Sequence, residues 1–308
     1  MSEMVATTAS KNTGFNFQKA QMEKLAKHLF LWTLLMIVLF PIIYIISISF
    51  NASGSIGSKL IPDSLTLNHW KYILGIPYLD ANGKEVLSPF PIMLWLWNSI
   101  KISSVSAVLM LLLSTTSAYA LSRFRFRGRQ SSLLVLMIIQ MFPNIMAMVA
   151  FYFMLDFIGG FIPWLGTDSH GGLILVYLGG TPFNIWLIKG YFDTIPKSIE
   201  ESAIMDGCTK FQAFWKIVLP LSTPILAVVG LLTFINTFSD FILPSILLKS
   251  GDKLTFAVGI QIFISDAFSG RWGPFAAACF LGAFPISAIF FTIHKYIISG
   301  LAMGGTKG

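Results

Sequence analysis

The chain has 308 residues, of which 55% are hydrophobic and only 11% are charged, with a net charge of +7. Soluble globular proteins carry roughly 25% charged residues, so this chain has too few to solvate a folded body of its size. The composition excludes a cytosolic enzyme, a disordered protein and a nucleic-acid-binding protein. It indicates a polytopic membrane protein, because several apolar stretches are long enough to cross a bilayer core of about 30 Å.

Apolar segments divide the chain into five regions. We expect an N-terminal segment at 1–27, a first membrane helix at 28–50, a loop at 51–90, a core with five further helices at 91–298, and a C-terminal tail at 299–308. Helix-breaking prolines and glycines interrupt several of these segments. Such residues are tolerated in a membrane helix where neighbouring helices or cavity water satisfy the freed backbone groups. The six expected spans are 28–50, 91–121, 131–155, 171–192, 218–247 and 273–298, and the breakers are Pro143, Gly179-Gly180-Thr181-Pro182, Pro224 and Pro285.

Lysine and arginine predict the orientation, because cytoplasmic loops carry an excess of them. Fourteen lie before the first span, between spans two and three, around the connection between spans four and five, and after span six. The opposite side carries six, and Lys101 lies near the start of span two. We therefore expect both termini in the cytoplasm.

The arginine cluster at 123–129 lies in the short connection after span two, interleaved with Phe124 and Phe126. We interpret it as a topology determinant at the membrane interface, and contact with anionic lipid head groups is compatible with that interpretation. The loop at 51–90 and the connection at 156–170 are predicted to be external.

The connection between spans four and five, at 193–220, is the most informative stretch. Ser198 and Glu201 have the spacing of a capping box, which predicts a helix start. Gly207 is placed to end that helix, because glycine accepts the left-handed conformation that follows a helix C-terminus. Acidic residues flank the helix, namely Glu200, Glu201 and Asp206.

A second helix is predicted to start at a capping box formed by Thr209 and Gln212 and to continue to Pro220. The first helix carries the small residues Ser202 and Ala203, which would let a partner's backbone approach closely. Two interpretations of this helix are equally good. It could dock into a cleft on a partner, or it could be an amphipathic helix at the membrane interface that joins two spans.

This loop resembles the EAA loop of permeases from ABC importers, whose pattern reads E-A-A-x3-G-x9-I-x-L-P. The chain matches it with Glu201-Ser202-Ala203, Gly207 and Ile217-Val218-Leu219-Pro220, with Ser202 in place of the first alanine. Residues 90–308 are similar to MalG-type permeases of maltose/maltodextrin importers, and the first span is similar more loosely. The phrases that carry this likeness include STTSAYALSRFRFRG (114–128), QMFPNIMAMVA (140–150), IKGYFDTIP (188–196) and the tail SGLAMGGTKG (299–308).

The resemblance implies an all-α bundle of the type I ABC importer class in the inner membrane of a bacterium, with six transmembrane helices and cytoplasmic termini. Such a permease moves oligosaccharides into the cytoplasm together with a second, MalF-like permease subunit, two MalK-like ATPase subunits and an external sugar-binding protein. The chain itself would not be an enzyme, because ATP is hydrolysed on the ATPase subunits. No cofactor is implied.

The family pattern also implies roles for individual residues. The coupling helix, seated in a cleft of an ATPase subunit, would consist of Glu201, Ser202, Ala203, Asp206 and Gly207. The glycine-rich tail would reach into the interface of the ATPase dimer through Gly304, Gly305, Lys307 and Gly308.

Polar groups at membrane depth are costly and become functional hypotheses. Asn236 and Asp240 are candidate residues of the substrate pathway or its gate. The alternative interpretation of Asp240 is an interfacial acid exposed to water at a helix end. No metal site is expected, because His170 has no second ligand nearby and the two cysteines, Cys208 and Cys279, lack metal-type spacing.

Two alternatives stay open. The chain could be a permease for a different oligosaccharide, or a secondary carrier driven by an ion gradient. A carrier would need coupling acids or broken helices in two corresponding halves, and the sequence has no convincing internal repeat. An enzyme of the membrane would need catalytic residues at depth, and no such set assembles.

Overall fold

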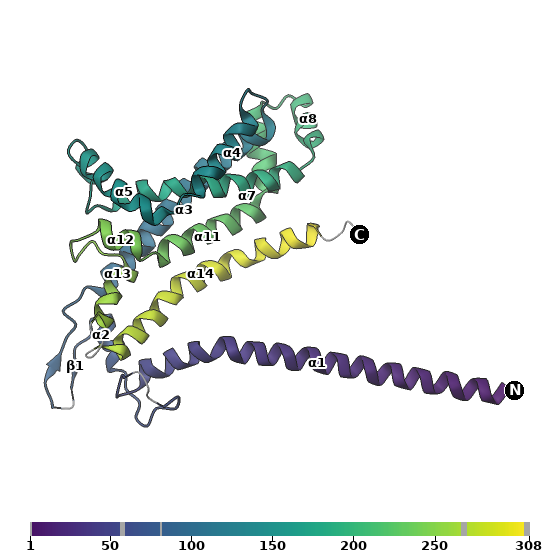
Figure 1. Cartoon of the computed structure of the whole chain (residues 1–308), viewed down its shortest axis with the longest axis horizontal. Helices are drawn as coiled ribbons and strands as arrows, with labels where there is room; N and C mark the ends of the chain where they lie inside the picture. Colours follow the sequence, from purple (N-terminus) through teal and green to yellow (C-terminus); the bar gives the residue numbers. More distant parts are fainter. Residues whose placement is uncertain (1, 56–58, 81, 266–269, 305–308) are drawn as a thin grey trace.

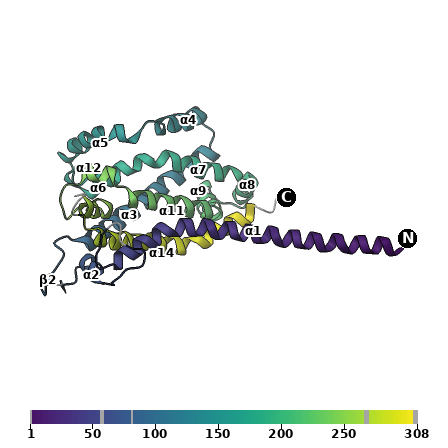
Figure 2. The ribbon, with the colours of Figure 1, turned by 60° about the horizontal axis from the view of Figure 1, so that its bottom comes forward.

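The computed structural model describes residues 2–55, 59–80, 82–265 and 270–304 and is mostly helical. The first helix, α1 (Ser2–Phe50), unites the expected N-terminal segment and the first span. Its C-terminal half lies beside the last helix, α14 (Trp272–Gly304), while its N-terminal half extends beyond the rest of the bundle (Figures 1 and 2).

The loop after α1 contains a little secondary structure of its own. A short helix, α2 (Asn68–Leu74), is followed by a two-stranded antiparallel hairpin of β1 (Tyr78–Leu79) and β2 (Glu85–Val86). In this hairpin Tyr78 lies opposite Val86. The helix α2 packs against α14, so the loop is tied to the bundle.

The second span, α3 (Ile92–Arg123), is the centre of the bundle. It packs along both α7 (Thr181–Thr194) and α11 (Thr223–Ser239). Small hydroxyl residues let helices approach closely in a membrane protein. The buried ones on α3 are Ser99, Ser103, Ser106, Ser114, Thr115 and Ser122.

The third apolar segment is divided rather than straight. The helices α4 (Arg129–Gln140) and α5 (Asn144–Gly159) meet at 99° around Pro143, so the proline does more than kink one span. Proline disfavours a helical conformation in the residue before it, which explains why α4 ends at Gln140. None of the described residues of α4 is fully buried. One side of the helix packs against α7 through the half-buried Leu133 and Leu136, and most of its other apolar side chains are exposed.

The expected fourth span, at 171–192, folds as a nearly continuous helical stretch, while the expected fifth span, at 218–247, is divided. The fourth consists of α6 (His170–Tyr177), a 3-10 turn and α7. The fifth reduces to α11, because the chain bends by 74° before Thr223 and leaves the helix at Asp240. The remaining elements are η1 (Pro163–Leu165), η2 (Leu178–Gly180), α8 (Lys197–Met205), α9 (Lys210–Ala213), the π-helix η3 (Phe214–Val218), α10 (Leu219–Leu221), α12 (Ile242–Leu247), α13 (Phe256–Gln261) and η4 (Ile262–Ile264).

Within the described residues, four helical stretches are long and apolar enough to cross a membrane, and six if each of two bent pairs forms one span. The count of six spans and the side on which each terminus lies therefore stay predictions. The two ends of the bundle differ, with α8 at one end and α2, α12 and α13 at the other (Figure 1). We call them the α8 end and the α12 end.

Candidate functional site

The loop with the family pattern folds as two short helices at the α8 end. The first, α8, begins at Lys197 directly after Pro196, and no side chain caps it. The predicted capping box at Ser198 and Glu201 is therefore wrong. Pro196 takes the capping position, and its extended backbone sets the direction in which α8 leaves α7.

Gly207 ends α8 as the sequence predicts. Its φ is +90°, in the left-handed region. The amide of Gly207 donates to the carbonyl of Ile204, and the amide of Cys208 donates to that of Ala203, both at 3.0 Å. These two bonds form a Schellman motif, in which a glycine satisfies the last helix carbonyls.

The capping box of the second helix is confirmed. Thr209 accepts from the amide of Gln212 at 3.2 Å, and the Gln212 side chain accepts from the amide of Thr209 at 2.9 Å. Further along, the helix widens into the π-turn η3 just before Pro220. Proline cannot donate to the carbonyl four residues earlier and its ring clashes with it, which the wider turn relieves.

The two faces of α8 differ in burial. Ala203 and Glu200 are buried against the chain itself, whereas Glu201, Ser202 and Asp206 are exposed. Met205 is 87% exposed, an extreme value for an apolar side chain. We call the surface formed by Glu201, Ser202, Met205 and Asp206 the outer face of α8. Ala203 is not part of it.

The inner face of α8 is fixed by a buried ion pair. Arg123, the last residue of α3, donates from Nε to Glu200, and both side chains are less than a tenth exposed. Arg123 also donates from Nη2 to the carbonyl of Ile195 at 3.0 Å, and Tyr119 donates from Oη to Glu200 at 3.1 Å. We call the contact between Arg123 and Glu200 the α3–α8 ion pair. It joins the end of a membrane helix to α8 and to the segment before it.

Tyr119 extends this contact into an apolar core. Its ring lies 4.6 Å from that of Phe214 on the π-helix and 6.4 Å from that of Phe192 on α7, between ring centroids. The ring of Phe124 lies 5.7 Å away. Tyr119 of α3 thus contacts α7, α8 and η3. A displacement of α8 is therefore resisted by several helices at once.

Sequence reasoning missed the role of Glu200 and of Arg123. The prediction treated Arg123 as one of the arginines of the 123–129 cluster at the membrane interface, but its side chain is buried in an ion pair. The signal available in the sequence was its position one turn after Tyr119 at the end of an apolar span. Four-residue spacing places the two side chains on the same face of a helix.

Of the two candidate pathway residues, Asn236 is exposed on α11, and Asp240 is half-buried at the end of that helix. Asp240 accepts from Oη of Tyr177 at 2.9 Å and from the amide of Ile242, the first residue of α12, at 3.1 Å. It therefore holds α6, α11 and α12 together. The structure does not bring Asn236 and Asp240 into contact with α8.

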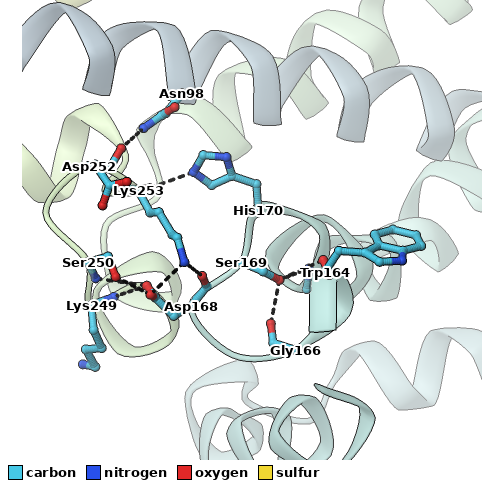
Figure 3. A network of polar contacts seen from close by, with 11 residues as sticks. Asn98, Trp164, Gly166, Asp168, Ser169, His170, Lys249, Ser250, Asp252 and Lys253 are labelled. Carbon is cyan, nitrogen blue, oxygen red and sulfur yellow. Dashed lines mark hydrogen bonds and ion pairs between the residues drawn. The ribbon is translucent and has the colours of Figure 1, made fainter. Parts of the chain in front are cut away.

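A second polar network, which the sequence did not predict, lies at the α12 end (Figure 3). Asp168 accepts from the amides of Lys249 and Ser250 at 2.8 and 3.0 Å, from Oγ of Ser250 at 2.5 Å and from Nζ of Lys253 at 3.1 Å. Burial would raise the pKa of the Asp168 carboxyl, but these bonds outweigh burial and hold that pKa well below its ordinary value of 3.8. We call this set the Asp168 network.

The Asp168 network is reinforced from neighbouring elements. His170 contacts the carbonyl of Lys253 through Nε2 at 2.8 Å, and Asn98 of α3 donates to the carbonyls of Asp252 and Leu254 at 2.9 and 3.0 Å. These contacts fix the segment between α12 and α13 against α3 and α6. His170 thus has a structural partner, and among the described residues no group of three or more His, Cys, Asp or Glu side chains is placed to hold a metal ion.

The C-terminal tail is only partly described. Gly304 is the last residue of α14, and Gly305, Lys307 and Gly308 lie outside the described residues.

Comparison with known proteins agrees with this arrangement. The family of binding-protein-dependent transport system inner membrane components matches residues 110–302, which include α8 and α9. Relatives called maltose/maltodextrin transport system permease protein MalG are similar over most of their length. The protein from Vibrio parahaemolyticus is 46% identical over 92% of this chain and 95% of its own, and that from Escherichia coli is 41% identical over 91% and 95%.

A solved structure shares the fold. It is a bacterial ABC transporter involved in the import of the acidic polysaccharide alginate, with a TM-score of 0.69, 25% identity, and coverage of 90% of this chain and 96% of its own. The fold, the loop pattern and the relatives lead to one assignment. The chain belongs to the family of binding-protein-dependent transport system inner membrane components, as an integral membrane permease of the MalG type.

Proposed function

We propose that the chain is the permease subunit of an ABC importer that moves maltose or maltodextrin-type oligosaccharides into the cytoplasm. The relatives, 41–46% identical over more than nine-tenths of the chain, support this substrate class. The solved importer of an acidic polysaccharide is more distant at 25% identity, so a neutral sugar is favoured. The permease works with a second, MalF-like permease, two MalK-like ATPase subunits and an external sugar-binding protein.

The ATPase subunits dock on the outer face of α8. This proposal rests on one observation above all: the helix with the family pattern exposes Glu201, Ser202 and Asp206 on its outer face, while its inner face is bonded to α3 through Glu200. A force applied to the outer face therefore reaches a membrane helix without passing through a flexible linker. The Schellman turn at Gly207 adds a second fixed end.

ATP hydrolysis takes place on the separate ATPase subunits. The sequence has no G-x-x-x-x-G-K-[ST] loop, the pattern that cradles nucleotide phosphates. The proposed tail contacts, through Gly304, Gly305, Lys307 and Gly308, would give the ATPase dimer a second attachment to this chain.

Asn236 and Asp240 are proposed to act at the substrate pathway or its gate. Asp240 suits a gate better than a binding site, because its two oxygens already accept from Tyr177 and from the amide of Ile242. Asn236 is exposed, and its side-chain amide makes no hydrogen bond within the described part of the chain, so it is available to a sugar hydroxyl.

Reconstitution in liposomes tests the proposal. The chain is inserted with its partner permease, the ATPase subunits and the binding protein, and uptake of labelled maltotriose is measured with and without ATP. We expect ATP-dependent uptake that an excess of unlabelled maltodextrin suppresses and an alginate oligosaccharide does not. The chain alone should transport nothing. Uptake by the chain alone under an ion gradient would refute the importer and favour a secondary carrier.

A further inference from the structure

A basic cavity lies beside the loop that joins α3 to α4. It measures about 680 Å³, and its lining includes the cationic side chains of Arg125, Arg129 and Lys189 together with Gln130 and Ser131. The apolar side chains of Phe126 and Leu133 complete one wall. A space with three cations, two further polar side chains and an apolar wall suits a ligand that is anionic at one end and apolar at the other.

The positive charge of this cavity is only partly neutralised by the chain. Asp193 accepts from Nζ of Lys189 at 2.5 Å and from Oγ of Ser122 at 2.6 Å, and its charge also acts on Arg129. One carboxylate thus faces three cations. Arg129 donates from Nε and Nη2 to the carbonyls of Leu121 and Ser122, which carry no net charge.

Arg125 makes no hydrogen bond or ion pair within the described part of the chain. The cavity therefore keeps a surplus of positive charge and guanidinium donors that an anion can use. Guanidinium groups bind phosphate oxygens in a planar, two-pronged geometry.

The cavity lies beside the point on α4 where polar residues give way to apolar ones. Polar residues occupy the start of α4, and the apolar run begins at Leu133, four residues after Arg129. At a rise of about 1.5 Å per residue, that is roughly 6 Å along the helix axis. The apolar side chains that follow are more than half exposed, namely Leu134, Val135, Ile138 and Ile139. Acyl chains can lie along this surface while the head group sits in the cavity.

We propose that this cavity binds the head group of an anionic phospholipid, with Arg125, Arg129 and Lys189 around its phosphate and the acyl chains along α4. A lipid is favoured over an acidic protein surface because the apolar face of α4 continues directly from the cavity. The site is separate from the outer face of α8 and does not depend on which sugar is carried. It would anchor the start of α4 close to the end of α3, where the α3–α8 ion pair begins.

The test uses the full chain purified in a neutral detergent with whichever subunits accompany it. Native mass spectrometry measures binding of phosphatidylglycerol, phosphatidylcholine and inorganic phosphate to the wild type, R125Q and R127Q. Arg127 is exposed in the same loop but does not line the cavity, so R127Q is a matched control for charge. Both residues are at the surface, and unchanged melting temperatures will verify that the variants fold.

We expect R125Q to weaken phosphatidylglycerol binding about fivefold, as the loss of one cation near a membrane surface predicts. R127Q should change it little, and phosphatidylcholine binding should be weak and equal in all three proteins. Equal losses in R125Q and R127Q would overturn the proposal, because they would show that the general positive charge of the loop attracts the lipid and that the cavity does not. Equal binding of both lipids, or displacement of phosphatidylglycerol by inorganic phosphate at the same concentration, would overturn it as well. So would loss of accompanying subunits from R125Q with lipid binding unchanged.

Discussion

The two ends of the bundle both use a carboxylate to hold a loop, but in different surroundings. In the α3–α8 ion pair the side chains of Arg123 and Glu200 are 6% and 8% exposed. In the Asp168 network, Lys253 and Asp168 are 42% and 27% exposed. Removing one partner of a buried pair leaves an uncompensated charge, whereas water compensates an exposed one. The α8 end is therefore held rigidly, and the α12 end is held by several weaker bonds.

The mechanical consequence follows from that difference. The proposed transmission of force through α8 requires a connection that does not yield, and the α3–α8 ion pair is costly to break. The Asp168 network holds a connection through four hydrogen bonds to one carboxylate, which water can replace one at a time. We therefore expect mutations at the α8 end to have the larger effects.

The largest effect is expected from Arg123→Ala. It leaves Glu200 buried without its cation and should cost about 3–5 kcal/mol of stability. The thermal unfolding of the purified protein measures this loss. Arg127→Ala, a matched change at an exposed position of the same loop, should leave the melting temperature nearly unchanged. A similar melting temperature for both variants would show that the α3–α8 ion pair does not hold α8.

Removing both partners sharpens the same point. A variant with Arg123→Met and Glu200→Leu has no unpaired charge and should be more stable than either single variant. ATP hydrolysis without sugar uptake is the expected outcome in the reconstituted complex, because α8 would fold but no longer be bonded to α3. If ATP hydrolysis still drives sugar uptake in this variant, the movement of α8 is transmitted to α3 through the packing of Tyr119 and not through the ion pair.

A smaller loss is expected from Gly207→Val. No neighbouring atom lies within 4 Å of the position of an added Cβ, so the cost is the left-handed conformation alone, about 1–2 kcal/mol. The shifted end of α8 should reduce ATPase co-purification and uptake. Gly251→Val is the control, because Gly251 also has open space but no left-handed conformation. Unaltered co-purification and uptake in Gly207→Val would argue against docking on α8.

At the α12 end, Asp168→Ala should cost about 1 kcal/mol, because solvent replaces part of what is lost. Its signature is local: the amides of Lys249 and Ser250 lose their acceptor and should exchange with deuterium faster. Asp252→Ala removes a carboxylate from the same segment, and the Asp252 contact in the network uses its backbone carbonyl. If both variants speed exchange equally, the Asp168 network is not the cause of protection.

The smallest expected effect concerns pH. The pKa of Asp168 is held below 3.8, so its stabilisation is present above that value and is lost only as the pH falls toward the lower folded value. The difference in melting temperature between wild type and Asp168→Ala should stay constant between about pH 7 and about pH 5. A difference that shrinks in this range would mean that the carboxyl takes up a proton there.

Local patterns predicted local structure well. The turn at Gly207 and the capping box at Thr209 followed from residue type and spacing, because both depend on bonds within a few residues. The start of α8 was predicted wrongly because Pro196 sets the direction of the chain and leaves Ser198 inside the helix. The family pattern located the loop but could not tell that Ala203 faces inward.

Contacts between distant segments could not be predicted from one sequence. Arg123 and Glu200 are 77 residues apart, and Asp168 and Ser250 are 82 apart. The position of Arg123 one turn after Tyr119 hints that its side chain is buried, but no local pattern identifies Glu200 as its partner or Ser250 as the partner of Asp168. The bend at Pro143 shows the same limit, since a proline predicts an interruption but not an angle of 99°.

The central claim is that the outer face of α8 contacts the ATPase subunits. Cross-linking in the assembled complex tests it. The variant is Met205→Cys, in a chain in which Cys208 and Cys279 are replaced by serine. Lys249→Cys, exposed at the α12 end, is the control. We expect Met205→Cys to form a cross-linked product with an ATPase subunit and Lys249→Cys to form none. A transporting complex in which Met205→Cys gives no such product would contradict the account.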